Sequence, residues 1–355
     1  MTRDSSSRTG VTIGVDVGDR RSDVCVLDAA GAVAARLRVA TTAVALAQAL
    51  RPYRAARVIL EVGTHSPWVS RLFGGLGHEV VVANPRRVRR IAGQEDKRDR
   101  IDAELLARLG RVDPTVLRPI THGSEQAQRD RALLRVRDAL VRTRTTLVTQ
   151  ARGLTKSLGV RVPGCDAQTF AKRITAAGLA SAVPGLPTLV AAVDELTRRI
   201  GQLDQEIERV CRERYPATAT LRQVAGVGPI TALAFVVTVE DPRRFARSRA
   251  VGAYFGLRPK KRQSGAHDPE LGISKAGDAF VRRMLVQAAQ YILGHYGPDT
   301  ALRRCGERLR ARGGRAARKK AVVAVARKLA VLLHRLWVTG ERYEPLRAVP
   351  AAAGN

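Results

Sequence analysis

The first hundred residues alternate short apolar runs with amphipathic ones. Apolar, β-branched runs occupy residues 11–18, 22–31, 32–40, 56–63 and 78–85, and runs of this kind bounded by Gly, Asp or Pro are typical of strands. Apolar residues recur at helical spacing in 42–53, 66–76 and 99–110. Three early strands, two of them joined at Asp28 to Gly31, followed by alternating strands and helices predict a mixed α/β sheet with helices on its faces.

The element order of this first region, residues 1–122, fits an RNase H-like fold. A helical spacer follows over residues 123–213. Its later arm steps by four and three residues through Leu189, Val193, Leu196, Ile200, Leu203, Ile207 and Val210, and its earlier arm has a looser seam at Val136, Leu140, Thr143, Leu147, Ala151, Leu154 and Leu158. Such seams bury themselves against another helix. The arms therefore pair within one chain, or across two chains as a dimerisation coiled coil.

The third region, residues 214–355, is predicted to be mostly helical. Gly226-Val227-Gly228-Pro229 separates two short helical patterns and resembles a helix-hairpin-helix. In that unit the turn and the start of the second helix present backbone N–H groups to a phosphate. The same sequence also makes an ordinary turn between helices, so both interpretations stay open.

The charge of the chain indicates what kind of partner it binds. The chain has 62 Lys plus Arg against 32 Asp plus Glu, a formal net charge of +30, and a potential this positive attracts nucleic acid. Residues 301–330 look like part of this footprint, with a single acid, Glu307. The candidate nucleic-acid contacts are Arg86, Arg87, Arg89, Arg90, Gly226, Gly228, Arg258, Lys260, Lys261, Arg262, Lys275, Arg282 and Arg283.

Targeting and metal-scaffold signals are absent from the sequence. No apolar run approaches the roughly 20 residues that span a bilayer, and the first ten residues lack the apolar centre of a signal peptide. The four cysteines have no CxxC spacing, which argues against structural zinc and against a disulfide framework. We therefore expect a cytoplasmic protein with no membrane partner.

Four acids stand out against this cationic background. Asp16 and Glu61 each close an apolar run, while Asp99 and Asp102 are spaced i, i+3 on one predicted helix face. Hard oxygen ligands in this order suit Mg²⁺ or Mn²⁺ at one edge of the sheet. Taken singly, each acid has a simpler interpretation, because Asp99 is placed as a helix cap, Asp102 as a first-turn acid and Glu61 as a strand-end charge.

A second candidate site surrounds Ser264. The residue sits beside Gly265 and among the cations that run from Arg258 to Arg283. A serine hydroxyl becomes a nucleophile only where a base or metal takes its proton and cations stabilise the growing charge. On the residues alone, an ordinary loop serine is the alternative. Ser274 is the second candidate nucleophile and is interpreted as a cap for the following helix.

In this order, the four acids, the helical spacer and then AGVGPITA, YFGLRP, QSG, GISKAGD and VRRMLV resemble the DEDD insertion-sequence transposases of bacteria. Those proteins pair a RuvC-like domain with a C-terminal serine transposase domain and act as bridge-RNA-guided DNA recombinases. The resemblance covers almost the whole chain. It departs at Arg98, where the family often has Thr, and at Gln263, where it often has Ser, so that Ser264 is the only serine of its motif.

The resemblance implies a role for each part. Asp16, Glu61, Asp99 and Asp102 would bind Mg²⁺ or Mn²⁺, and Ser264 would join DNA through a phosphoserine. The implied partners are donor and target double-stranded DNA, a structured guide RNA from the element, and further copies of the chain in a dimer or tetramer, with one protomer's metal domain completing another's serine site. Two other functions remain open, a metal-dependent RuvC-like nuclease of the Holliday-junction type and a non-catalytic nucleic-acid scaffold.

Overall fold

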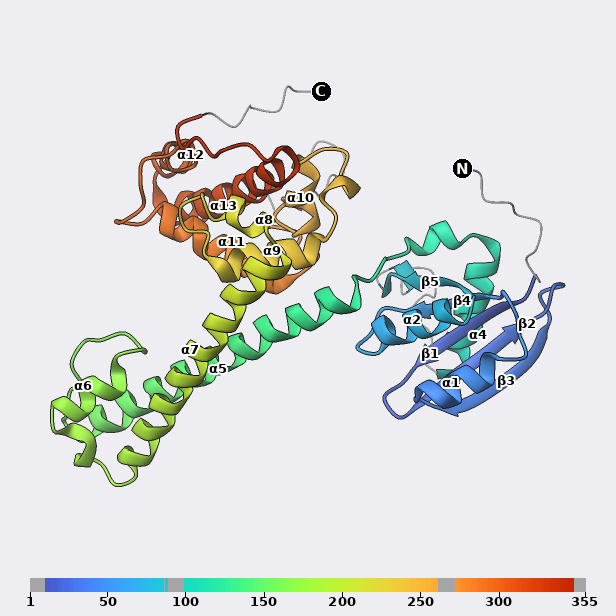
Figure 1. Cartoon of the computed structure of the whole chain (residues 1–355), viewed down its shortest axis with the longest axis horizontal. Helices are drawn as coiled ribbons and strands as arrows, with labels where there is room; N and C mark the ends of the chain where they lie inside the picture. The colour runs from blue at the N-terminus through green and yellow to red at the C-terminus, as the bar shows by residue number, and fades with distance from the viewer. Residues whose placement is uncertain (1–9, 86, 89–98, 261–271, 348–355) are drawn as a thin grey trace. The chain divides into compact units, whose positions relative to one another are not determined.

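A computed structural model describes residues 10–85, 87, 88, 99–260 and 272–347 of the chain (Figure 1). Two compact units result, Met1–Gly123 and Ser124–Asn355. The long helices of the spacer region belong to the second unit together with the C-terminal helices. The division into three regions at residues 122 and 213 stays a prediction.

The first unit is built on a five-stranded mixed sheet in the order β3-β2-β1-β4-β5. The strands are β1 (Thr12–Val17), β2 (Arg21–Leu27), β3 (Val33–Ala40), β4 (Arg57–Glu61) and β5 (Glu79–Ala83). β1, β2 and β3 pair antiparallel, whereas β4 runs parallel to β1 and β5 parallel to β4. The predicted mixed sheet is confirmed, and its order is consistent with an RNase H-like domain.

Successive residues of a strand point to opposite faces of the sheet. Ile13 and Val15 pack in one core with residues of α1 (Ala43–Leu50) and α2 (Ser66–Gly75). Gly14 faces α4 (Asp99–Val112), where a Cβ on this glycine would lie 1.9 Å from the carbonyl oxygen of Ala103. Only a residue without a side chain lets the α4 backbone come so close to the central strand.

The end of α4 fixes the direction of the helix on the sheet. Arg111, in its last turn, donates hydrogen bonds to the carbonyl oxygens of Gly10, Asp28 and Ala29. Gly10 precedes β1, and Asp28 and Ala29 lie in the β2–β3 turn. α4 therefore runs antiparallel to β1, and its first residues lie toward the carboxyl end of that strand.

Two long antiparallel helices begin the second unit, α5 (Glu125–Ser157) and α7 (Leu186–Arg214), with α6 (Phe170–Ala176) packed at their far end (Figure 1). They pack against each other within the chain, which confirms the intramolecular pairing. The α7 seam is also confirmed, since Val193, Ile200, Ile207 and Val210 are buried.

The seam predicted for α5 is confirmed only in part. Ala151 is buried and Leu147 packs in the same cluster, but Val136 is 52% exposed and Leu154 46%. The buried residues Leu134, Val148 and Thr155 were not part of the predicted seam. The reason is that arginines share the contact face. Arg137 forms an ion pair with Asp204 of α7, with Nε and Oδ1 2.7 Å apart, and Arg144 donates to the hydroxyl of Thr197. An apolar period cannot reveal a seam that is partly polar.

The remaining helices form a single core with the adjoining ends of α5 and α7. They are α8 (Ala217–Leu221), α9 (Pro229–Val239), α10 (Arg249–Tyr254), α11 (Ala279–Ile292), α12 (Ala301–Arg310) and α13 (Gly314–Thr339). α9 is buried from Thr231 to Val239, and Phe235 packs against Phe255. The described part of this region is helical, and α13 packs in the same core through Leu329 and Leu333. Among the described helices, none is long and apolar enough to cross a membrane.

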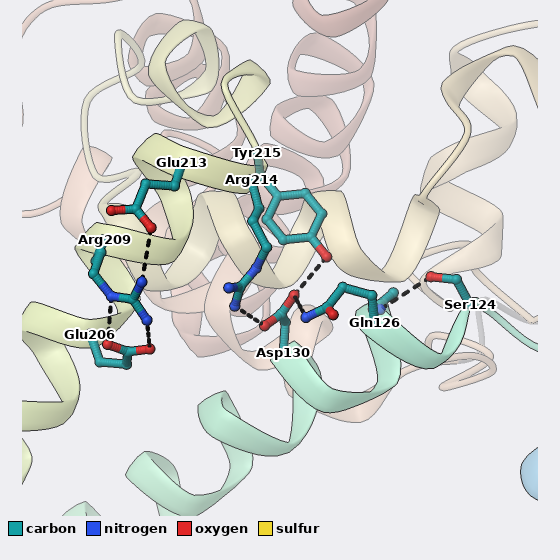
Figure 2. Close-up of polar contacts among 9 residues, drawn as sticks. Ser124, Gln126, Asp130, Glu206, Arg209, Glu213, Arg214 and Tyr215 are labelled. Carbon is teal, nitrogen blue, oxygen red and sulfur yellow. Dashed lines mark hydrogen bonds and ion pairs between the residues drawn. The ribbon is translucent and has the colours of Figure 1, made fainter.

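A buried carboxylate joins α5 to the end of α7 (Figure 2). Asp130 is 3% exposed and accepts hydrogen bonds from Arg214 (2.5 Å), Tyr215 (2.8 Å) and Gln126 (3.1 Å). Burial acts to raise the pKa of Asp130, but these three donors outweigh it and the pKa is lowered. The carboxylate is therefore charged in the folded protein, and it satisfies three polar groups at once.

Asp130→Asn is expected to destabilise the protein by about 2 kcal/mol, because a charged acceptor of several hydrogen bonds is lost. Thermal unfolding measures this difference. The matched control is Glu206→Gln, which loses an ion pair with the exposed Arg209 (2.6 Å; Figure 2) and is expected to change stability far less. Since the folded pKa of Asp130 is lowered, the difference is fully present above about pH 4 and declines as the pH falls through the folded pKa. Equal stability of Asp130→Asn and wild type at neutral pH contradicts this assignment.

Candidate active site

Two of the predicted acids lie side by side at the carboxyl ends of parallel strands. β1 and β4 pair in register up to Val15 and Leu60, so the next residues, Asp16 and Glu61, are neighbours. Both share a face with Gly14 and Ile59, which contact α4 through Ala103 and Gly110 respectively. Both carboxylates are half-buried. The sheet therefore places them together on the α4 side.

The third acid reaches the same edge from α4. Asp102 precedes Ala103, whose carbonyl packs on Gly14, two residues before Asp16. Because α4 runs antiparallel to β1, Asp99 lies one turn further toward the strand's carboxyl end. The side chain of Asp99 lies outside the described residues, so for this acid the structure gives only the backbone position. Asp16, Glu61 and Asp102 are brought to one edge of one sheet.

The donor types at this edge fit a hard divalent cation, because carboxylate oxygens are the ligands that Mg²⁺ and Mn²⁺ prefer. Within the part of the chain that the structure describes, however, no group of three or more His, Cys, Asp or Glu side chains is close enough to hold a metal ion. The backbone places the acids together, and the metal site itself stays a prediction.

A fifth acid at this edge was not predicted. Asp23 of β2 is the direct cross-strand partner of Asp16, is 8% exposed and lies 4.0 Å from Nε of Arg38 on β3. Directly opposed residues of an antiparallel pair have Cβ atoms about 5 Å apart. The sequence could have predicted this position, because the alternation from Ser22 to Leu27 puts Asp23 on the same face of the strand as Cys25.

The segment after Glu61 is ordered by hydrogen bonds. Nε1 of Trp68 donates to Nδ1 of His65 (3.1 Å), so the proton of this imidazole resides on Nε2, which donates to Asp19 at 3.3 Å. The hydroxyl of Ser66 donates to the carbonyl of Gly63 at 2.8 Å. These bonds connect the residues that follow β4 with those that follow β1, and so stiffen the edge that carries the acids.

Ser264, Lys261 and Arg262 lie outside the described residues, but the chain on both sides is described. Residues 256–260 and 272–275 pair antiparallel. The N–H of Lys260 donates to Gly272, that of Ser274 to Arg258 and that of Lys275 to Gly256, at 2.9, 2.9 and 3.1 Å. Arg258, Lys260 and Lys275 are exposed. Three of the predicted cations therefore flank the segment that carries Ser264.

Ser274 is not the cap of the next helix. α11 begins at Ala279, and its cap is Asp278, whose side chain accepts hydrogen bonds from the N–H groups of Phe280 and Val281. Ser274 lies four positions before this residue, and its backbone belongs to the paired segment instead. The interpretation of Ser274 as a cap was wrong, because GISKAGD continues in extended and turn conformation to its last residue.

The Gly226–Pro229 turn joins two helices as predicted, between α8 and α9. Gly226 has φ +81°, and a Cβ there would lie 3.0 Å from the carbonyl oxygen of Ala288 on α11, so packing alone explains this glycine. Gly228 faces open space. The turn lies between cavities of about 590 and 350 Å³, and both are lined by Gly226 and Gly228.

The other predicted nucleic-acid contacts differ in whether their charged groups already have partners within the protein. Arg87 is described, whereas Arg86, Arg89 and Arg90 are outside the described residues. Arg282 donates to two backbone carbonyls and Arg283 pairs with Asp138, so both guanidinium groups have partners within the protein. An exposed basic surface extends over α12 and the start of α13 through Arg304, Arg308, Arg312, Arg315, Arg318, Lys319 and Lys320.

Comparison with known protein families finds two matching models. Residues 13–158 match the DEDD transposase model of the IS110 type, and residues 218–305 match the transposase model of the IS116/IS110/IS902 family. The first match contains all four predicted acids, and the second contains Ser264.

Individual relatives are also described as transposases. The chain is 28% identical to the transposase for insertion sequence element IS1111A of Coxiella burnetii, over 93% of this chain and 90% of the relative. It is 30% identical to the transposase for insertion sequence element IS1328 of Yersinia enterocolitica, over 78% and 82%. A putative transposase, y4rJ, of Sinorhizobium fredii is 32% identical over 78% and 75%.

Proposed function

The chain belongs to the IS110/IS116 family of insertion-sequence transposases, and we propose that it cuts and rejoins DNA through a covalent bond to Ser264, assisted by its acidic edge. The observation that carries this proposal is the placement of Asp16, Glu61 and Asp102 at one edge of the sheet. Three acids lie together in a protein whose net charge is +30, although carboxylates repel the phosphates of a nucleic acid. This arrangement favours a chemical role for the edge.

The acids would hold a hard divalent cation. When bound by Asp16, Glu61, Asp99 and Asp102, Mg²⁺ or Mn²⁺ supplies charge neutralisation at a scissile phosphate. The protein's own contribution is a fixed framework. Gly14 seats α4 against β1, the β1–β4 register sets Asp16 beside Glu61, and the bonds around His65 order the adjoining segment. Such preorganisation is what positions charge for a reaction in advance.

The serine step balances without an external energy source. The hydroxyl oxygen of Ser264 attacks phosphorus, a bond from serine oxygen to phosphorus forms, and the bond from phosphorus to the 3′ oxygen breaks. The serine proton passes to a base, and the leaving oxygen takes up a proton to become a 3′-hydroxyl. A second 3′-hydroxyl then attacks the phosphoserine and releases the serine. Because the phosphodiester is conserved in the intermediate, strands are rejoined without ATP.

A structured RNA from the element is proposed to choose donor and target DNA by base pairing. Support comes from the composition, since a net charge of +30 with only 4% aromatic residues suits contacts to phosphate backbones more than contacts to individual bases. The exposed α12–α13 cations, the paired segments around Ser264 and the Gly226–Pro229 turn are the proposed surfaces.

Assembly into a dimer or tetramer is proposed to bring two DNA partners together. Val136 and Leu154 on α5 are exposed at the side of the seam that α7 does not cover. The exposed side of α5 that carries these two residues is the proposed contact with a second copy. One protomer's acidic edge would then serve the serine segment of another.

Recombination of DNA tests the function as a whole. We expect purified protein with its co-purifying RNA and Mg²⁺ to join an element-junction duplex to a target duplex, seen as a new junction by sequencing. RNase treatment before the reaction is expected to remove the product, and untreated protein is the control. Free cut ends without joined product would support a metal-dependent nuclease instead, and salt-sensitive binding without any cutting would support a scaffold.

A further inference from the structure

One guanidinium group joins the two sides of the base, residues 255–260 and 272–278, which flank in sequence the segment that carries Ser264. Nη1 of Arg282, on α11, donates to the carbonyl oxygen of Phe255 at 3.1 Å and to that of Ala276 at 2.8 Å. Phe255 precedes residues 261–271 and Ala276 follows them. A single side chain therefore ties the backbone that precedes this segment to the backbone that follows it.

The two sides of the base are packed backbone to backbone. Gly256 and Gly277 both have φ +69°, and a Cβ on Gly277 would lie 2.0 Å from the carbonyl oxygen of Tyr254. A Cβ on Gly256 would lie 2.3 Å from the carbonyl oxygen of Ala276. No side chain fits at either position, so the base has little freedom to open or to shift its register.

The base is also anchored to α5. The side chain of Asp278 is 7% exposed and pairs with Arg131 at 2.6 Å and Arg135 at 3.0 Å, both on α5. Burial acts to raise the pKa of Asp278, but the Val281 amide and the two arginines outweigh it, so the pKa is lowered. The same carboxylate caps α11. Asp278 thus holds both the start of α11 and two turns of α5.

A second contact fixes the same two helices. Arg283 of α11 pairs with Asp138 of α5 at 2.5 Å. Between the two anchors, the ring of Phe280 lies beneath the guanidinium groups of Arg135 and Arg283, at 5.4 and 5.2 Å from its centroid. Positions 131, 135 and 138 fall on one face of a helix. α5 therefore presents a continuous surface to the start of α11.

We propose that Arg282 and Asp278 are positioning residues for Ser264, and that α5 is the helix that holds the base of the Ser264 segment in place. This inference rests on the proposed function, because it assigns the base a role in the serine step. α5 begins two residues after the unit that carries the acidic edge. α5 therefore follows the acidic edge directly along the chain, and it also binds the base that flanks the Ser264 segment.

Arg282→Lys separates positioning from contact with nucleic acid. Lysine keeps the charge but lacks the planar group that reaches two carbonyls. With full-length protein, its co-purifying RNA and element-junction DNA at saturation, we expect the rate of Ser264–DNA adduct formation to fall about 100-fold, as small misplacements of reacting groups do. DNA affinity and its salt dependence are expected to change by less than about twofold, since no phosphate contact is lost.

Amide hydrogen exchange gives a readout that does not depend on catalysis. In Arg282→Lys the N–H groups of Lys260, Ser274 and Lys275, which are hydrogen-bonded in the base, are expected to exchange faster than in the wild type. Arg212→Lys, at an exposed position near the end of α7, is the matched control and is expected to change neither exchange nor rate.

Asp278→Asn guards against a variant that fails to fold. Asparagine preserves the helix cap but not the charge that binds Arg131 and Arg135, so we expect a folded protein with the same two effects. The inference is overturned if Arg282→Lys weakens DNA binding while the saturated adduct rate stays unchanged, or if exchange in the base is unaltered. Absence of a Ser264 adduct in the wild type overturns the proposed function, and the positioning role with it.

Discussion

Replacing Ser264 with alanine is expected to abolish the covalent protein–DNA adduct and to lower recombination by at least about 10⁴-fold, because removing a nucleophile eliminates the path through its covalent intermediate. The measurement is a denaturing gel of the reaction with labelled element-junction DNA, Mg²⁺ and co-purifying RNA. DNA binding is expected to be retained, because the substitution removes no charge.

Ser274→Ala is the matched control for this prediction. Ser274 is the second serine of the region, and it binds the base through its backbone N–H, which donates to the carbonyl oxygen of Arg258 and which alanine keeps. We expect this variant to form the adduct at the wild-type rate. An adduct that survives in Ser264→Ala and is lost in Ser274→Ala would reassign the nucleophile.

The second large effect is expected at the acidic edge. Asp16→Asn removes a charge next to Glu61 while keeping the shape of the side chain. We expect cleavage and adduct formation to fall by about 10³-fold, or about 4 kcal/mol in the barrier, the scale of electrostatic stabilisation at a phosphate. Quench-flow or manual sampling under single-turnover conditions measures this rate.

An acid away from this edge provides the comparison. Asp113 caps the short 3₁₀ turn Pro114–Leu117 beyond the end of α4, and Asp113→Asn keeps an effective cap. We expect its reaction rate to equal that of the wild type. If Asp16→Asn also reacts at the wild-type rate, the acids are structural and the serine acts without them.

The sheet of the first unit was predictable because each strand carries its own signal. β1, β2, β4 and β5 are short and largely apolar; β4 ends on Glu61, and Asp16 is the last residue but one of β1. The seam of α7 was predictable for the same reason. The seam of α5 was predictable only in part, since Arg137 and Arg144 complete it through Asp204 and Thr197, and the spacing of apolar residues does not show such pairs.

The candidate site was predictable only in part. Strand ends and helix spacing place Asp16, Glu61 and Asp102 at one edge, but Asp23 comes there through the register of β2, which depends on the turn at Asp28. Asp278 and Arg282 act through contacts with residues far away in the sequence. Their partners are chosen by packing in three dimensions, and sequence spacing does not encode that choice.

The most direct test is to identify the residue that becomes joined to DNA. Protein, co-purifying RNA, Mg²⁺ and element-junction DNA are reacted, denatured and digested with protease and nuclease, and the peptides are analysed by mass spectrometry. We predict a nucleotide on Ser264 in the wild type and none in Asp16→Asn. DNA cleavage with no modified peptide, in wild type and Ser264→Ala alike, would contradict the account and establish hydrolysis at the acidic edge.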